Sequence, residues 1–152
     1  MKDPQIWAIF GNTVFVPGIT AWFIAQVIKV ILTWITTRKM DMGRFVGSGG
    51  MPSSHSSLVT AVTTSIGLTQ GFASPLFGLA LTVAIIVMYD AANVRRAAGE
   101  QARILNRLVG FLFREEEFSD KQLKELLGHK PIEVLAGAVL GTLTGVVFYL
   151  LR

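Results

Sequence analysis

The chain has 152 residues, of which 51% are hydrophobic and only 16% are charged, and it contains no cysteine. Soluble domains carry about 25% charged residues, so this composition argues against a water-soluble domain, and the absence of cysteine excludes disulfides and thiolate metal sites among these residues. The formal net charge of +4 would suit a nucleic-acid partner, but the positions of the basic residues favour a membrane protein, and we expect no nucleic acid.

Four apolar segments each approach the roughly 20 residues that a helix needs to cross the hydrocarbon core of a bilayer. They run from about Ile19 to Ile35, from about Ser56 to Leu68, from Pro75 to Tyr89 and from Ile132 to Leu151. A shorter apolar stretch, Ile6 to Phe15, ends at Pro17-Gly18 and is expected to form a half-helix packed against the bundle. We therefore predict an all-α fold with about four spanning helices and one or two shorter ones, in a single membrane-embedded domain over residues 1–152.

A polar stretch from Asn93 to Lys130 separates the third and fourth segments. Its first part has apolar residues at helical spacing: Val94, Ala98, Ile104, Leu105, Leu108, Phe111 and Leu112. We predict that a helix continues there beyond the membrane and is followed by an acidic turn at Glu115–Glu117. A short amphipathic helix is expected to start at Ser119-Asp120-Lys121-Gln122, so that residues 94–128 form a cytoplasmic helical insertion.

The basic residues gather on one side of the membrane if each segment crosses once. Of the 14 Lys and Arg, only Lys2, Lys29 and Arg152 do not belong to this group. The group consists of Arg38, Lys39, Arg44, Arg95, Arg96, Arg103, Arg107, Arg114, Lys121, Lys124 and Lys130. The positive-inside rule then makes this face cytoplasmic in a multi-pass protein of the cell membrane. For about half of these charges, setting the topology is a sufficient explanation.

Two histidines open two of the segments on this same charged face. His55 lies in Gly-Gly-Met-Pro-Ser-Ser-His-Ser-Ser (residues 49–57), and His129 lies in Gly-His-Lys-Pro-Ile-Glu (residues 128–133). A helix N-terminus offers free backbone N–H groups and a positive dipole, which suit phosphate. Two such helix ends, two imidazoles and many guanidinium groups on one face favour an anionic substrate.

The residues after His129 indicate how it is held. If the last helix includes His129, Glu133 follows at i+4 on the same face, and Gly137, Gly141 and Gly145 continue that line as a ridge along which membrane helices pack closely. A carboxylate beside the imidazole would fix its tautomer and strengthen the other ring nitrogen as a nucleophile. Alternatively, Glu133 is only a first-turn acid favoured by the helix dipole, or the glycine ridge forms a homodimer contact and turns Glu133 toward a partner chain.

These motifs resemble a known superfamily. Pro52-Ser53-Ser54-His55 is similar to the Pro-Ser-Gly-His motif of the type 2 phosphatidic-acid phosphatases and vanadium haloperoxidases. Residues 128–137, Gly-His-Lys-Pro-Ile-Glu-Val-Leu-Ala-Gly, are similar to the final motif of that superfamily, His-x-x-x-Asp followed by Val-Leu-Ala-Gly. The divergent bacterial and plant branch also shares Gly-Gly-Met-Pro-Ser-Ser-His-Ser and Met-Tyr-Asp-Ala-Ala (residues 88–92) with Val-Arg-Arg (residues 94–96). The likeness extends from residue 21 to residue 145.

The resemblance implies a metal-independent phosphatase without a cofactor, acting at the cytoplasmic face on a lipid or polyprenyl phosphomonoester or diphosphate. His129 would attack phosphorus and form a phosphohistidine, and Glu133, in place of the family's Asp, would orient it. His55 would protonate the departing alkoxide and then activate water for the second step. Ser53 and Ser54 would hold phosphate oxygens.

The family's first motif, Lys-x₆-Arg-Pro, is not present in that form. Lys29 is its leading substitute because an ionisable group within a span is a functional candidate, although a lysine there can also snorkel to the interface. The other substitutes for phosphate binding are Arg38, Lys39, Arg44 and Lys130.

The arginine of the family's final motif is also missing, because Leu123 stands at its position. Arg95 and Arg96 would supply the guanidinium group from the end of the third segment. Asp90 and Asn93 would orient these arginines, or Asp90 would simply form an ion pair with one of them.

Other functions remain open at this point. One is a non-catalytic membrane scaffold or anionic-lipid binder that retains the phosphatase fold. Vanadate-dependent peroxidation is disfavoured because the known haloperoxidases are large soluble proteins. Hydrolysis by a metal site is poorly supported, because two distant histidines without cysteine make a thin ligand set. The usual core of the family has about six helices, so this smaller chain is expected to complete itself as a homodimer if it needs more.

Overall fold

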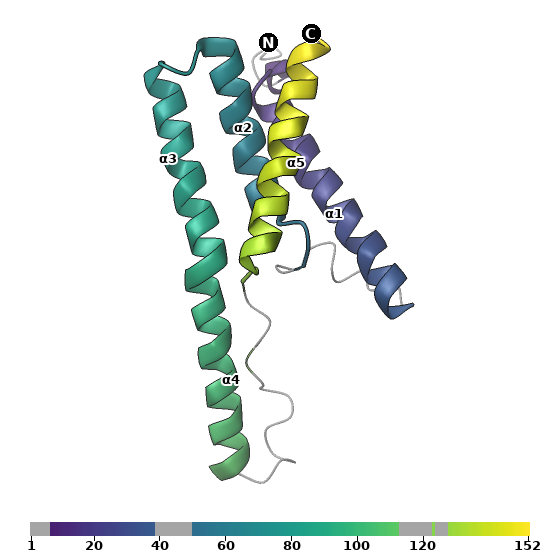
Figure 1. The fold of residues 1–152 in the computed structure, drawn as a ribbon, viewed down its shortest axis with the longest axis vertical. Helices are drawn as coiled ribbons and strands as arrows, with labels where there is room; N and C mark the ends of the chain where they lie inside the picture. Colours follow the sequence, from purple (N-terminus) through teal and green to yellow (C-terminus); the bar gives the residue numbers. More distant parts are fainter. Residues whose placement is uncertain (1–6, 39–49, 113–122, 124–127) are drawn as a thin grey trace, which may run out of the picture.

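The computed structural model describes residues 7–38, 50–112, 123 and 128–152 (Figure 1). Within these ranges the chain is helical and has no β-strand, which confirms the predicted all-α class. The elements are a 3-10 turn (Trp7–Gly11), α1 (Phe15–Thr37), α2 (Ser54–Gln70), α3 (Pro75–Tyr89), a π-helical turn (Asp90–Val94), α4 (Arg95–Leu112) and α5 (Pro131–Leu150).

Helix α2 is the centre of the bundle, because it packs against α1, α3 and α5. Its buried residues are mostly small and polar: Ser54, Ser56, Ser57, Ala61, Thr63, Ser65, Ile66 and Gly67. The Thr60 and Thr63 hydroxyls donate to carbonyls one turn earlier, each at 2.7 Å, so they are satisfied within the helix. A helix enclosed by protein on several sides can therefore do without the apolar surface that lipid requires.

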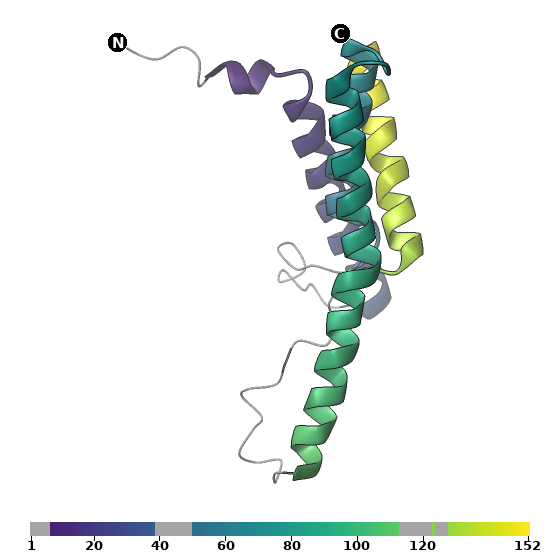
Figure 2. The same cartoon turned by 90° about the vertical axis from the view of Figure 1, so that its left-hand side faces the viewer.

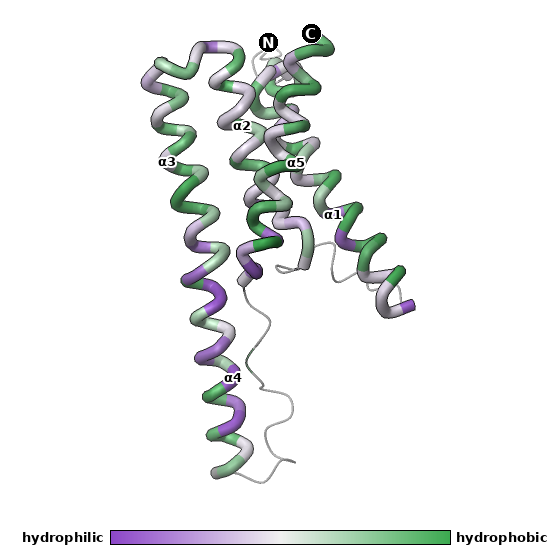
Figure 3. The backbone as a smooth tube through the Cα atoms, viewed as in Figure 1, coloured by the Kyte–Doolittle hydropathy of each residue, from purple (hydrophilic) through white to green (hydrophobic). Residues whose placement is uncertain are grey.

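Three of the four predicted spans are long and apolar enough to cross a membrane by length and composition. They are Phe15–Thr37, Pro75–Phe111 (α3 with its continuation) and Pro131–Leu150. Helix α2 is not among them, because it has only 17 residues and many of them are small and polar. Figure 3 shows the apolar residues concentrated on α1, α3 and α5, while α2 is paler.

The glycine ridge of α5 packs against α2 within the same chain. A Cβ atom at Gly137 would overlap the carbonyl oxygen of Ser53, and one at Gly141 would overlap that of Ser57. Across the same contact, the Thr60 hydroxyl lies 3.2 Å from the carbonyl oxygen of Ala138. Because α2 occupies this ridge, the alternative in which it forms a homodimer contact is wrong.

Helix α1 starts earlier than the apolar pattern indicated. Its first residue is Phe15, so Pro17-Gly18 lies inside the first turns and the break expected there is wrong. Proline is tolerated because the N–H groups of a first turn have no intrahelical partner. The side chain of Asn12 ends the preceding 3-10 turn and accepts the N–H groups of Val14 and Phe15, both at 2.9 Å. A turn of 3-10 helix thus replaces the predicted half-helix.

Helices α3 and α4 form one long rod joined by the π-helical turn (Figure 2). This confirms that a helix continues past the third apolar segment. The α4 part projects beyond the other helices, and its residues change from apolar to mostly polar (Figure 3). The acidic turn and the short amphipathic helix expected over residues 115–122 lie outside the described residues.

The contact between α2 and α5 can be tested with two glycine substitutions. We expect Gly141→Ala to lower the free energy of unfolding by about 2 kcal/mol or more, because the new methyl group meets backbone of α2 that cannot move aside. Gly78→Ala on α3 is the control, since nothing lies within 4 Å of the added Cβ there. Unfolding by SDS in mixed micelles, followed by circular dichroism, measures both. Equal stability of the two variants would contradict the close contact.

Candidate active site

The segments that carry the two histidines meet at one end of the bundle, beside the junction of α3 and α4. The N–H of Ser53, just before α2, donates to the carbonyl of Glu133 in α5 at 2.9 Å. The N–H of His129 donates to the carbonyl of Ala91 in the π-helical turn, also at 2.9 Å. The starts of α2 and α5 are thus fixed to each other, and the His129 backbone is fixed to the α3–α4 rod.

Gly128 lets the chain enter this junction. Its φ angle is +88°, a conformation that favours glycine. A Cβ atom at this position would also come within 2.8 Å of the Cα atom of Arg96. Glycine is therefore required both for the turn and for the close approach of the His129 segment to the start of α4.

His129 is paired with Glu133, although not as a member of the same helix. The N-cap of α5 is Lys130, so His129 lies just before the helix. Its Nδ1 atom is 3.0 Å from Oε2 of Glu133, which also accepts the N–H of Lys130 at 3.2 Å. Glu133 consequently serves both as the partner of the imidazole and as a first-turn acid, the two alternatives that the sequence left open.

The Glu133 contact leaves the other ring nitrogen of His129 available. A carboxylate can only accept a hydrogen bond, so Nδ1 carries the proton and Nε2 keeps its lone pair. His129 is 3% exposed, and among the described residues no hydrogen-bond partner reaches Nε2. A buried, oriented and unpaired imidazole nitrogen is an arrangement suited to a nucleophile.

Burial is the main cause that lowers the pKa of His129 below its usual value. The hydrogen bond from Nδ1 to Glu133 opposes this shift, and the positive charges of Lys29 and Arg95 add to it. The imidazole is therefore neutral at pH 7, and its Nε2 lone pair is not lost to a proton.

Lys29 points into the bundle and does not snorkel to the interface. It is 3% exposed, and its Nζ donates to Oγ of Ser54 and to Oε1 of Gln26, each at 3.0 Å. Gln26 was not among the predicted site residues. Its signal in the sequence was a second polar residue in an apolar span, three positions before Lys29 and so on the same helical face.

The two serines before His55 serve partly as scaffold. Ser53 is the N-cap of α2, and its Oγ accepts the N–H and the hydroxyl of Ser56 at 3.3 and 3.0 Å. Ser54 Oγ accepts from Lys29 at 3.0 Å and keeps its own proton for another acceptor. Ser54 is therefore the serine that links the start of α2 to the buried lysine.

His55 is exposed at the second residue of α2 and shares this end of the bundle with charged groups. His129, Lys29, Arg95 and Asp90 all act on its ring electrostatically. Nε of Arg95 donates to Oδ2 of Asp90 at 2.7 Å across the π-helical turn, so Asp90 orients Arg95 as an ion-pair partner. In the described part of the chain, no three His, Cys, Asp or Glu side chains are grouped to hold a metal ion.

Several residues predicted to bind phosphate or to orient the arginines are not brought into this group. Arg38 is the exposed C-cap of α1, whose end diverges from the other helices in Figure 1. Arg96 is exposed, although its backbone lies close to Gly128. The Asn93 amide donates to the carbonyl of Tyr89 in its own helix at 3.3 Å, and not to an arginine. Lys130 is exposed beside His129.

Two more candidate positions, Lys39 and Arg44, lie outside the described residues. Leu123, which replaces the family's arginine, is held at a distance from the membrane-embedded helices. Its backbone N–H and carbonyl bond to the side chain of Asn106 in α4 at 2.9 and 2.8 Å.

Comparison with known proteins identifies relatives of this chain. The profile of a family described as the divergent PAP2 family matches residues 10–144. A Bacillus subtilis (strain 168) protein, described as the uncharacterized membrane protein YuiD, is 43% identical to it, over 89% of this chain and 92% of that protein. No solved structure matches the chain.

The pKa of His129 gives a direct test of its pairing with Glu133. NMR of ¹⁵N-histidine-labelled protein is expected to place this pKa below the ordinary value of 6.5. Since Glu133 raises the pKa, Glu133→Gln is expected to lower it further. The folded state binds fewer protons here than the unfolded state, so this residue makes the fold less stable as the pH falls below about 6.5. A pKa at or above 6.5, or no shift in Glu133→Gln, would contradict the arrangement.

Proposed function

Because the chain belongs to the divergent PAP2 family, we propose that it hydrolyses a lipid or polyprenyl phosphomonoester, or the corresponding diphosphate, at the cytoplasmic face of the membrane. The observation that carries this proposal is the state of His129. Its Nδ1 is held by Glu133 at 3.0 Å, and its buried Nε2 has no partner among the described residues.

In the first step the lone pair of His129 Nε2 attacks phosphorus. The bond between phosphorus and the lipid oxygen breaks, and His55 gives that oxygen a proton as the alcohol leaves. The product is a phosphohistidine, whose positive ring is stabilised by the Glu133 carboxylate on the other nitrogen. In the second step His55 removes a proton from water, the water oxygen bonds to phosphorus, and the nitrogen–phosphorus bond breaks to release phosphate.

The negative charge of the transferred phosphoryl group needs fixed positive partners. Among the described residues Lys29 is the one buried Lys or Arg, and Ser54 and Gln26 hold its ammonium group near the starts of α2 and α5. The ammonium and the remaining Ser54 proton both offer donors to phosphate oxygens. Arg95, held by Asp90, supplies the guanidinium group in place of the family's missing arginine.

A lipid substrate agrees with where the site lies. His55 is exposed at the end of a bundle whose outer surfaces carry large apolar side chains, such as Ile85, Leu135 and Leu143. A substrate whose tail remains in the bilayer can bring its phosphate to this end without leaving the membrane. The basic residues expected on this face support the cytoplasmic orientation, by the positive-inside rule.

Substitution of His129 and substitution of His55 are expected to block different steps of the reaction. Purified protein should release phosphate from phosphatidic acid in EDTA, and His129→Ala should abolish this release and form no phosphoenzyme, because the nucleophile is gone. His55→Ala should slow release by about 10²-fold or more and accumulate phosphoenzyme, since the acid–base group is missing. Phosphate assays and ³²P labelling measure both effects.

A hydroxyl remote from the site gives the control for these variants. Thr82 lies on α3 and donates only to its own helix, so Thr82→Ala should keep the parental rate. If the parent releases no phosphate, the chain is a non-catalytic scaffold, and if both histidine variants hydrolyse substrate at the parental rate, the histidine mechanism is wrong. Activity lost in EDTA and restored by a divalent ion would exclude the metal-free mechanism.

Gln26 is expected to act through Lys29, as a positioning residue. Gln26→Met removes the acceptor that holds the ammonium group and should raise KM about tenfold, an effect equivalent to about 1.4 kcal/mol. Thr82→Ala, remote on α3, is the control and should leave KM unchanged. Steady-state kinetics with vesicle-bound substrate separate KM from kcat. An unchanged KM in Gln26→Met would refute this role.

A further inference from the structure

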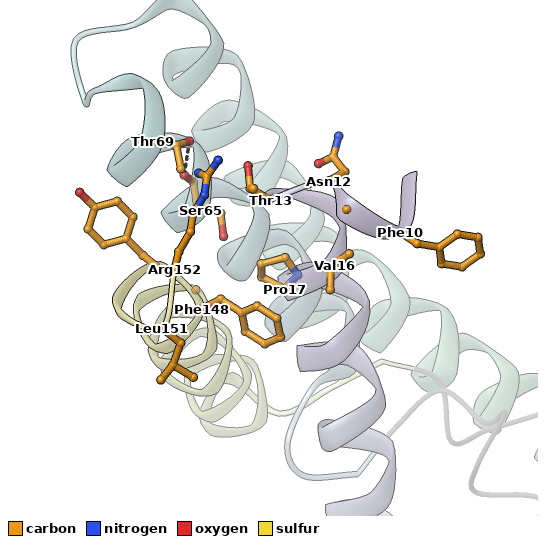
Figure 4. A pocket seen from close by; sticks show the side chains of 13 residues that line it. Phe10, Asn12, Thr13, Val16, Pro17, Ser65, Thr69, Phe148, Leu151 and Arg152 are labelled. Carbon is orange, nitrogen blue, oxygen red and sulfur yellow. Dashed lines mark hydrogen bonds between the residues drawn. The ribbon is translucent and has the colours of Figure 1, made fainter. Parts of the chain in front are cut away.

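A cavity lies at the end of the bundle opposite to both histidines. It is an open cavity of about 510 Å³ between the 3-10 turn, the start of α1 and the C-terminal parts of α2 and α5. Figure 4 shows the side chains around it, with Ser65 and Thr69 from α2 on one side and Val16 and Pro17 from α1 on another. Since α2 and α5 run from the histidines to this cavity, it opens toward the opposite membrane face.

A buried hydroxyl without a partner faces this cavity. Ser65 is 2% exposed, and its Oγ has no hydrogen bond within the described ranges. Other hydroxyls of α2 are satisfied by their own helix; that of Thr69, for example, donates to the Ser65 carbonyl at 2.6 Å. Leaving a buried hydroxyl unpaired costs free energy, so the Ser65 hydroxyl indicates a bound partner in the cavity.

The polar groups around the cavity are mostly donors. The guanidinium group of Arg152 extends toward the side where Ser65 and Thr69 lie (Figure 4). Asn12 accepts two backbone N–H groups with its Oδ1, which leaves its amide NH₂ to donate. Phe148 and Leu151 supply apolar surface beside these groups. A positive charge, free hydroxyl and amide donors and adjoining apolar walls suit an anionic amphiphile.

The depth of the cavity also fits a lipid headgroup. Ser65 lies five residues before the end of α2 at Gln70, which is roughly 7.5 Å along the helix axis. The headgroup region of a bilayer is about 5–7 Å deep on each side. If the end of α2 lies at the outer edge of this region, a phosphate at Ser65 and Arg152 lies near its inner border, with the acyl chains beside the apolar wall.

We propose that this cavity binds the anionic headgroup of a phospholipid from the leaflet opposite the histidine site. The phosphate accepts from Arg152 and Ser65, and the chains lie against Phe148 and Leu151. This site is independent of the proposed hydrolysis, because it shares no residue with the histidine end of the bundle.

Native mass spectrometry of the purified protein tests the site. The protein is titrated with phosphatidylglycerol and, in a parallel arm, with phosphatidylcholine. One phosphatidylglycerol should bind more tightly than phosphatidylcholine. Arg152→Gln should weaken this binding about tenfold and Ser65→Ala about fivefold, because each removes a donor to the phosphate. Arg103→Gln on α4 is the matched charge control and should bind as the parent does.

The outcomes separate this site from the catalytic one. His129→Ala should retain the tight phosphatidylglycerol, whether or not the chain is a phosphatase. Equal binding by the parent, Arg152→Gln and Ser65→Ala would overturn the proposal, as would equal affinity for the two lipids. Displacement of the lipid by inorganic phosphate would also overturn it, because the cavity would then bind a free anion. If Arg152→Gln and Ser65→Ala melt at the same temperature as the parent, their loss of lipid binding is not caused by unfolding.

Discussion

The close contact between α2 and α5 is the constraint on which the rest of the structure depends. Gly137 and Gly141 let the backbone of α5 reach the carbonyl oxygens of Ser53 and Ser57. At this separation the Ser53 N–H can donate to the Glu133 carbonyl at 2.9 Å. The two histidine segments therefore sit side by side because two helix backbones touch. A larger residue on the ridge would move His129 and Glu133 away from Ser54 and Lys29 together.

Polar groups inside this apolar bundle are satisfied almost entirely by near neighbours. Threonine hydroxyls donate to carbonyls of their own helices, and Lys29 donates to Gln26 and Ser54. Within the described ranges, two buried side-chain atoms lack a partner: His129 Nε2 and Ser65 Oγ. An unpaired polar atom is costly where water is scarce. His129 Nε2 lies at the end of the bundle where α2 and α5 begin, and Ser65 Oγ lies in the C-terminal part of α2, toward the other end. Each atom marks one of the two sites proposed for this protein.

The α3–α4 rod contributes to the histidine site through its backbone. The π-helical turn bonds the Arg95 N–H to the carbonyl of Asp90, five residues earlier, and the Ala91 carbonyl accepts the His129 N–H. The same turn places Nε of Arg95 at 2.7 Å from Oδ2 of Asp90. A break in regular helix geometry thus supplies both an anchor for His129 and an oriented guanidinium group, in keeping with the frequent occurrence of π-helical turns at functional sites.

The sequence alone determined the helical class, the apolar segments and the two histidine motifs, because hydrophobic runs and local motifs need no knowledge of neighbours. It also identified the glycine ridge, since residues four apart share a helix face, and it offered Glu133 as the partner of His129, although His129 lies just before the helix. It could not decide what the ridge packs against, whether Pro17 breaks a helix, or that Lys29 is held by Gln26 and Ser54. Nor did it show that Arg38 lies at the divergent end of α1, or that Arg96 is exposed although its backbone approaches the His129 segment. Those outcomes depend on which surfaces meet across the bundle, and only tertiary packing decides the depth, direction and partners of a side chain.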